Sequence, residues 1–160
     1  MRHRFPLPVL ALTLIALGAC EEHEYQPPDP AERVAEAETA FSPALFDTIT
    51  WASDSVRIEA GNLVYADECR RCHGTLGQGN TEYARTNGLD VPSLVRTDWQ
   101  AGDDVEAIRR RVFTGHPAGM PVWGVGRLTP RQIDAAAFYI VHQLRPEVSD
   151  TSTLPGLDRP

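Results

Sequence analysis

The chain has 160 residues, contains no lysine and carries a formal net charge of −7 at pH 7. This length is enough for one domain and a tail, and the absence of a basic stripe argues against nucleic acid as a partner. The acidity is uneven, because residues 20–54 hold nine acidic side chains against Arg33 alone, whereas residues 55–147 hold 11 acidic and 11 basic side chains. The overall charge therefore says little about a docking face.

The first residues have the order of a secretory signal peptide. Arg2 and Arg4 precede an apolar run over residues 9–17, which is too short to span a bilayer core of about 30 Å. The Leu-Gly-Ala sequence before Cys20 resembles the lipobox of bacterial lipoproteins. That resemblance implies that residues 1–19 are removed as a signal peptide and that the cysteine is lipidated. A signal peptide cut elsewhere and an uncleaved leader are the alternatives.

Residues 20–54 are predicted to form an acidic, proline-rich tether that follows the lipid. A flexible chain of about 30 residues spans about 30 Å, which lets a tethered domain reach partners near a membrane. Residues 31–40 can form a short helix with an alanine face. Four apolar residues are unexpected in a linker, and they either pack on the domain's own surface or dock on a partner subunit: Phe41, Phe46, Ile49 and Trp51.

The domain itself is predicted over residues 55–146, with a flexible tail over residues 147–160. Its first helix follows residues 53–55, each of which is a favourable N-cap. Three- and four-residue spacing places one set of side chains on a single helix face, which consists of Ile58, Gly61, Tyr65 and Cys69.

This helix runs into Cys69-Arg70-Arg71-Cys72-His73, and C-x-x-C-H is the attachment signature of c-type haem. Two thiols one helical turn apart can each add to a porphyrin vinyl group, and the adjacent histidine then binds the iron. A thioredoxin-like redox pair would need a βαβ context, and a structural zinc site would need four nitrogen or sulfur ligands. The three cysteines of the chain are thus assigned, one to lipid and two to haem.

Two further helices are indicated by their caps and apolar spacing. One begins at Asp103, with Glu106 as a capping-box acid, and ends at Gly115. The other has Thr129 as its N-cap, a proline at its first position and a stop at Pro146. No alternating run is long enough for a sheet, so the predicted fold class is all-α around a cofactor. The buried faces comprise Val105, Ile108, Val112 and Phe113 in the first of these helices, and Ile133, Ala136, Ala137, Ile140, Val141 and Leu144 in the second.

A six-coordinate haem iron needs a ligand opposite His73, and the sequence favours Met120 in Gly119-Met120-Pro121. Met120 is the only methionine outside the leader. A thioether is a soft, neutral ligand, and His/Met ligation raises the reduction potential relative to bis-histidine ligation. The adjoining glycine and proline bring the backbone close and stiffen the loop. The competing assignments are His116, His142 and an open iron site.

From residue 55 to residue 145 the chain resembles the class I c-type cytochromes, the small monohaem electron carriers. The likeness rests on the C-x-x-C-H motif, on the Gly-Met-Pro loop, and on a first and a last helix that carry Gly61, Tyr65 and Tyr139. It implies a cytochrome c fold with three main helices and loops around one covalent haem c. It also implies that the first and last helices cross at a small residue and aromatic rings.

The resemblance further implies residues around the haem. In this family a proline carbonyl accepts the proton on the far nitrogen of the haem histidine, and Pro92 is the equivalent here. Trp99 and Trp123 would cover haem edges or reach a propionate. Arg85 and Arg96 would pair with propionates or remain ordinary surface charges.

With both axial positions filled, the iron has no substrate site, so the chain is predicted to be an electron-transfer protein and no enzyme. We interpret it as a lipid-anchored cytochrome that faces the periplasm from a bacterial cell membrane or outer membrane. There it would pass single electrons by outer-sphere transfer between redox partners of a respiratory or photosynthetic chain.

Two alternatives to this interpretation stay open. The chain is either a fixed haem subunit of a larger membrane redox complex, or a haem enzyme or gas sensor with an open iron site. The complex would be of the oxidase type or of the alternative complex III type, whose monohaem lipoprotein subunits the chain loosely resembles.

Overall fold

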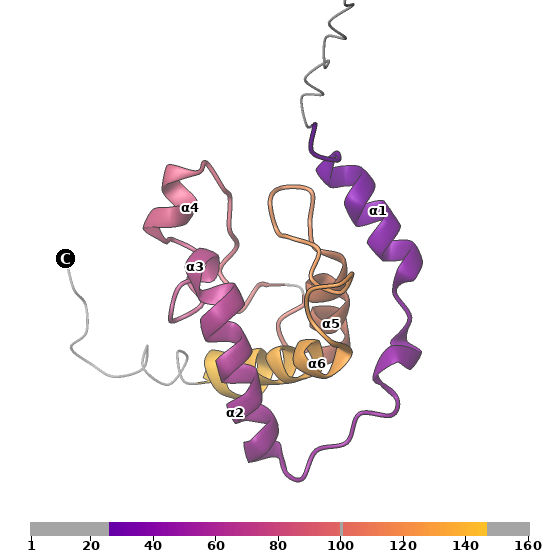
Figure 1. Cartoon of the computed structure of the whole chain (residues 1–160). Helices are drawn as coiled ribbons and strands as arrows, with labels where there is room; N and C mark the ends of the chain where they lie inside the picture. Colours follow the sequence, from indigo (N-terminus) through magenta and orange to yellow (C-terminus); the bar gives the residue numbers. More distant parts are fainter. Residues whose placement is uncertain (1–25, 100, 147–160) are drawn as a thin grey trace, which may run out of the picture.

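The computed structural model describes residues 26–99 and 101–146 (Figure 1). Throughout this part the regular structure is helical, without a strand, and the all-α prediction is confirmed. The predicted signal peptide, Cys20 and the tail over residues 147–160 lie outside the described residues. No helix of the described part is long and apolar enough to cross a membrane.

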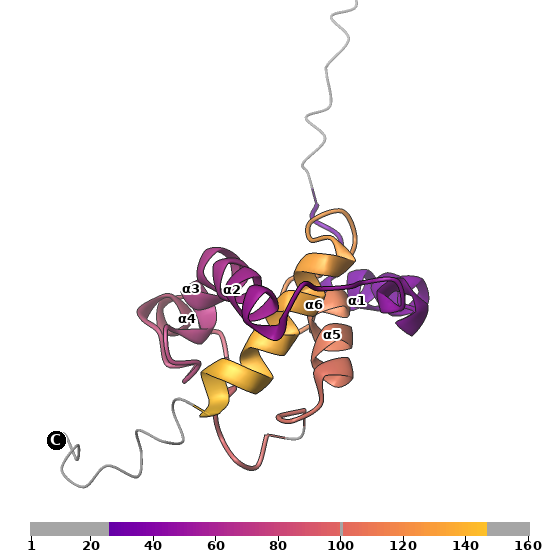
Figure 2. The ribbon, with the colours of Figure 1, turned by 90° about the horizontal axis from the view of Figure 1, so that it is seen from below.

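The helices form a small cluster around one crossing. In Figures 1 and 2, α2 and α6 cross near the centre, α5 lies beside α6, and α1 lies on the side away from α3 and α4. The elements are α1 (Pro30–Ala40), the 3-10 turn η1 (Pro43–Phe46), α2 (Asp54–Val64), the π-helical turn η2 (Tyr65–Cys69), α3 (Arg70–His73), α4 (Glu82–Thr86), α5 (Val105–Thr114), α6 (Pro130–Tyr139) and the π-helical turn η3 (Ile140–Leu144).

Capping side chains set where α5 and α6 begin. The Thr129 hydroxyl and the Gln132 side chain complete the predicted capping box of α6. The start of α5 differs from the prediction, because Asp104, and not Asp103, is its N-cap. The Asp104 carboxylate accepts hydrogen bonds of 2.8 and 3.1 Å from two backbone N–H groups of the first turn. Glu106 therefore lies too close to the cap to form the predicted capping box.

The core depends on the crossing of α2 and α6. A Cβ atom on Gly61 would lie 2.1 Å from the carbonyl oxygen of Ala135 and 2.6 Å from Cβ of Tyr139, so only glycine fits there. One turn later, the rings of Tyr65 and Tyr139 pack with their centroids 5.5 Å apart. The structure thus contains the helix crossing that the family resemblance implied.

The segment predicted as a tether is folded onto the domain from residue 30 onward, and we call residues 30–51 the N-terminal strap. In the strap, α1 packs against α5 and η1 packs against α6. Phe46 is buried in the core, and the ring of Phe41 meets the edge of Phe113 with centroids 5.5 Å apart. Burying a side chain of this size contributes about 1.5–3 kcal/mol. Packing on the domain's own surface is therefore the confirmed interpretation of these aromatic residues.

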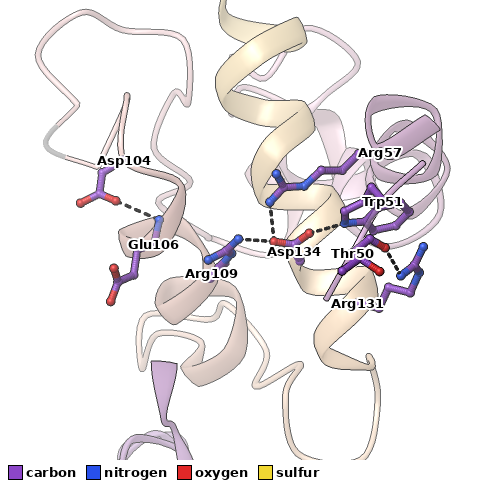
Figure 3. Close-up of polar contacts among 8 residues, drawn as sticks. All are labelled: Thr50, Trp51, Arg57, Asp104, Glu106, Arg109, Arg131 and Asp134. Atoms are coloured by element: carbon purple, nitrogen blue, oxygen red, sulfur yellow. Dashed lines mark hydrogen bonds and ion pairs between the residues drawn. The ribbon is translucent and has the colours of Figure 1, made fainter. Parts of the chain in front are cut away.

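Asp134 on α6 connects the strap to two other helices (Figure 3). Its carboxylate is 1% exposed and accepts a hydrogen bond of 2.7 Å from Nε1 of Trp51 in the strap. It also pairs with the guanidinium groups of Arg57 on α2 and Arg109 on α5. A buried charge is costly unless it is paired and hydrogen-bonded, so these three donors allow the carboxylate to stay in the interior.

Replacing Asp134 by asparagine should lower the free energy of unfolding by about 3 kcal/mol, because two guanidinium groups lose their compensating charge. Denaturant unfolding of the purified protein measures this loss. Asp98→Asn is the matched control, since the Asp98 side chain is 64% exposed and its pair with Arg96 lies on the surface. That control should leave the free energy of unfolding close to the wild-type value, because solvent screens an exposed ion pair. Equal losses in the two variants would contradict the role given to Asp134.

Candidate haem site

The C-x-x-C-H motif lies at the end of one continuous helical stretch. The helix α2 passes into the π-helical turn η2 and then into α3, which ends at His73. Gly74 follows with φ +79°, a conformation that favours glycine, and the chain leaves the helix there. Cys69 and Cys72 are free and half-buried, and together with the histidine they line a single cavity. The structure therefore directs two thiols and one imidazole into the same space.

The surroundings of the two thiols disfavour the thiolate form. Burial raises the pKa of Cys69 to about 12, and nearby Glu68 and Cys72 add to the effect. Burial also raises the pKa of Cys72, against the opposing effect of the Arg71 charge. Redox-active cysteine pairs need a lowered thiol pKa, so these cysteines do not match a thioredoxin-like pair. Among the described residues, no group of three or more His, Cys, Asp or Glu side chains can hold a zinc ion.

His73 lies in surroundings that favour the neutral imidazole. Burial lowers the pKa of this histidine, and the carbonyl group of Pro92 acts in the opposite direction by hydrogen bonding. Its Nδ1 atom is buried without a partner in ordinary hydrogen-bond geometry, so the contact with Pro92 is a loose one. A neutral imidazole is the form that binds a metal. A carbonyl beside the second ring nitrogen is a common way to orient a ligating histidine.

A cavity of about 1330 Å³ extends from the motif to α5 and to the loop that follows it. Cavities for small molecules usually measure about 300–1,000 Å³, so this one has room for a larger group. A porphyrin attached through Cys69 and Cys72 needs apolar walls on its two faces, and the residues present fit that requirement. The apolar part of the lining includes Leu94, Ile108, Val112, Trp123 and Ile140.

Met120 lines this cavity from the loop between α5 and α6, which lies across the centre of the molecule from α3 in Figure 1. Its side chain is half-buried and packs against the core. Its carbonyl oxygen accepts a 2.9 Å hydrogen bond from the backbone N–H of His116, which closes the loop. His116 also lines the cavity, but its side chain is exposed, and its Nδ1 atom accepts a 3.2 Å hydrogen bond from the backbone N–H of Ala118. The competing candidate His142 is exposed on η3.

Only part of the predicted haem surroundings comes together at the cavity. Arg85 donates hydrogen bonds of 2.8 and 3.0 Å to the side chain and the backbone carbonyl of Asn80, and it does not line the cavity. Arg96 does line it, while forming an exposed pair with Asp98 in which Nε lies 2.8 Å from Oδ1. Four of the five predicted neighbours are thus brought to the cavity, namely Pro92, Trp99, Trp123 and Arg96.

Two arginine–aromatic pairs line the cavity and were not predicted. The guanidinium of Arg71 lies 3.9 Å from the ring centroid of Tyr83, and that of Arg127 lies 4.7 Å from the ring centroid of Trp123. The four-residue spacing between Trp123 and Arg127 is a weak sequence signal for such a pair. Arg71 and Tyr83 meet only because the chain after the motif turns back, and no sequence pattern announces that contact.

Comparison with known proteins gives a family match. Residues 56–140, more than half of the chain, match the family described as cytochrome c oxidase, cbb3-type, subunit III. A cbb3-type cytochrome c oxidase subunit CcoP of Azospirillum sp. (strain B510) is 33% identical over 93 residues, which are 58% of this chain and 30% of that protein. A cbb3-type cytochrome c oxidase subunit FixP of Bradyrhizobium diazoefficiens is 36% identical over 84 residues, which are 52% of this chain and 26% of that protein.

A third relative, a cbb3-type cytochrome c oxidase subunit CcoP of Rhodobacter capsulatus, is 34% identical over 98 residues, with 58% of this chain and 31% of that protein covered. The matched part of the chain thus spans less than a third of the length of these relatives. No solved structure matches the chain.

The double variant Cys69→Ala/Cys72→Ala should contain no covalently attached haem, because no thioether can form at the motif. Mass spectrometry of the denatured polypeptide, together with extraction of the pigment by acidified acetone, measures this loss. Cys20→Ser is the matched control, which removes the remaining cysteine of the chain and should keep the haem attached. A double variant that retained the added mass would show that attachment occurs elsewhere.

Proposed function

We propose that this chain, which belongs to the cytochrome c oxidase, cbb3-type, subunit III family, moves single electrons through one covalent haem c as part of a membrane respiratory complex. The observation that carries this proposal is the single cavity lined by the C-x-x-C-H motif on one side and by Met120 on the other. The relatives described above are named as oxidase subunits. The assignment of an oxidase role to this shorter chain is our inference.

His73 and Met120 are proposed as the two iron ligands. Burial favours the neutral form of the histidine, and the methionine is the cavity-lining thioether whose loop is closed by its own backbone hydrogen bond. The bound haem supplies a one-electron iron couple. The residues of the chain would keep both ligands in place in the two oxidation states, so that little would have to move when an electron arrives.

The remaining side chains would exclude water from the faces of a haem bound in the cavity and would leave the side next to the motif accessible. Ile108 and Val112 on α5 are 2% and 3% exposed and provide an apolar wall. On the opposite side, Cys69 and Cys72 are only half-buried, and Leu76 in the following turn is 54% exposed. We propose that electrons enter and leave at this edge. A filled sixth position would also disfavour the alternative of a haem enzyme or gas sensor.

The folded strap favours a fixed subunit over a freely swinging carrier. Its contacts with α5 and α6 remove most of the predicted flexible link to Cys20. The oxidase subunits among the relatives favour the oxidase type over the alternative complex III type. We retain lipidation of Cys20 as the proposed membrane attachment, with the domain in the periplasm.

Met120→Ala should abolish the weak near-infrared band of methionine-ligated ferric haem. It should also shift the redox equilibrium at least tenfold toward the oxidised form, about 59 mV for one electron, because a neutral sulfur ligand is lost. Absorption spectroscopy and a redox titration measure both effects. His116→Ala is the control and should leave the band in place. A wild type without this band, together with loss of the low-spin spectrum in His116→Ala and not in Met120→Ala, would make the histidine the sixth ligand.

After extraction of the membrane with a mild detergent, the tagged full-length chain should co-purify with large membrane-spanning subunits that contain further haem. We expect this because the strap and the oxidase relatives both point to a fixed position in a complex. Native gels and mass spectrometry of the eluate measure the association. Recovery of the chain only as a monomer, in the wild type and in Cys20→Ser alike, would favour a free carrier.

A further inference from the structure

Hydrogen bonds hold the backbone at the end of α3. The proposed binding of iron by His73 and Met120 does not by itself require these bonds. The carbonyls of the last residues of a helix have no partner within that helix. Here three consecutive carbonyls find donors outside the motif. The Cys72 carbonyl accepts from Thr81 Oγ1 at 3.2 Å, and the His73 carbonyl accepts from the backbone N–H of Gly79 at 2.9 Å. The Gly74 carbonyl accepts from the Tyr65 hydroxyl at 2.7 Å and also, at 3.2 Å, from the backbone N–H of Gly77. We call the bonds from Thr81, Gly79 and Tyr65 the carbonyl clamp.

We propose that Tyr65 and Thr81 are positioning residues that fix the direction of the Cα–Cβ bond that carries the His73 imidazole, Thr81 by holding the peptide group before His73 and Tyr65 by holding the second peptide group after it. The backbone of a residue has two soft dihedral angles, and each one turns the peptide plane on one side. The Cys72 carbonyl belongs to the plane before His73, and the His73 carbonyl belongs to the plane after it. Thr81 and Gly79 hold one plane each, so the clamp acts on both dihedral angles of the histidine.

Tyr65 extends the clamp to the helix crossing. Its side chain is 2% exposed, and its ring packs on Tyr139 of α6 while its hydroxyl reaches the Gly74 carbonyl. A phenol is a donor only while it is protonated, and burial raises the pKa of Tyr65 well above its usual value. The bond therefore ties the position of the motif to the α2–α6 core.

Thr81 and Gly79 complete the clamp from the chain that follows the motif. The Thr81 hydroxyl donates to the Cys72 carbonyl and accepts a 3.0 Å hydrogen bond from the Ala84 N–H, which starts α4. Gly79 has φ +78°, and a Cβ atom there would lie 2.2 Å from the Val91 carbonyl oxygen. The backbone at Gly79 therefore packs closely against the Val91 carbonyl, and in this position the Gly79 N–H donates to the His73 carbonyl.

The test compares Tyr65→Phe and Thr81→Val with two controls in the haem-loaded full-length protein. Thr81→Ser keeps a hydroxyl that can make both hydrogen bonds. Ile133→Val removes a methyl group from a residue that is 0% exposed on α6, and it lowers stability without removing a hydrogen bond of the clamp. The loss of stability is of the same order as that from one lost hydrogen bond, so Ile133→Val controls for destabilisation alone.

The readouts are the NMR shifts of the haem methyl groups in the oxidised protein, whose spread depends on the orientation of the axial imidazole, and the redox equilibrium against a fixed mediator. We expect an altered spread in Tyr65→Phe and in Thr81→Val. We also expect at least a threefold change in that equilibrium when the two substitutions are combined. Thr81→Ser and Ile133→Val should retain the wild-type spread.

A wild-type spread in both Tyr65→Phe and Thr81→Val would overturn the proposal, and so would an equal change in Ile133→Val. The inference rests on the proposed ligation by His73, and its failure can be told apart from failure of that function. If the ligation were wrong, the wild-type protein itself would lack the spectrum of a low-spin His/Met haem. Should Thr81→Val fail to mature because α4 loses its cap, Tyr65→Phe, which leaves that cap intact, decides the question.

Discussion

The close approach of α2 and α6 at Gly61 is the contact on which the rest of the structure depends. A Cβ atom at this position would lie within 2.1 Å of the α6 backbone, so the distance between the two helices is set by the absence of a side chain. Tyr65 follows one turn later, and its hydroxyl reaches the Gly74 carbonyl at 2.7 Å. The crossing thereby determines where α3 ends and where the motif faces the cavity. A glycine that does not line the cavity thus constrains the candidate haem site.

The strap is held by charge as well as by apolar burial. Arg110 on α5 lies 2.7 Å from a carboxylate oxygen of Glu38 on α1, and Arg131 on α6 donates to the Thr50 carbonyl at 2.8 Å (Figure 3). The first pair is exposed and contributes little, whereas Asp134 is buried and engages two arginines. The strap therefore behaves as part of the domain, and folded structure begins at residue 30, well before the predicted domain boundary.

Most of what the sequence predicted about the fold is local. Thr129 as the cap of α6, Gly115 as the end of α5 and the glycine at the helix crossing each have a short-range or family pattern, and each is present. The misplaced start of α5 is an error of one residue between two adjacent aspartates. The strap, the π-helical turns and the buried Asp134 depend on contacts between distant segments, and neither composition nor periodicity encodes those contacts.

The haem site likewise has a part that the sequence predicts and a part that it does not. Coordination chemistry requires particular residue types, so a cysteine–histidine motif and one methionine can be read from the sequence alone. Which residues lie at the rim of the cavity depends instead on the tertiary fold. Arg109 pairs with a buried carboxylate and Arg85 bonds to Asn80, while the unpredicted Arg127 lines the cavity. An arginine can pair with a propionate only if no nearer carboxylate or carbonyl group already pairs with it. The tertiary fold determines whether such a nearer group is present.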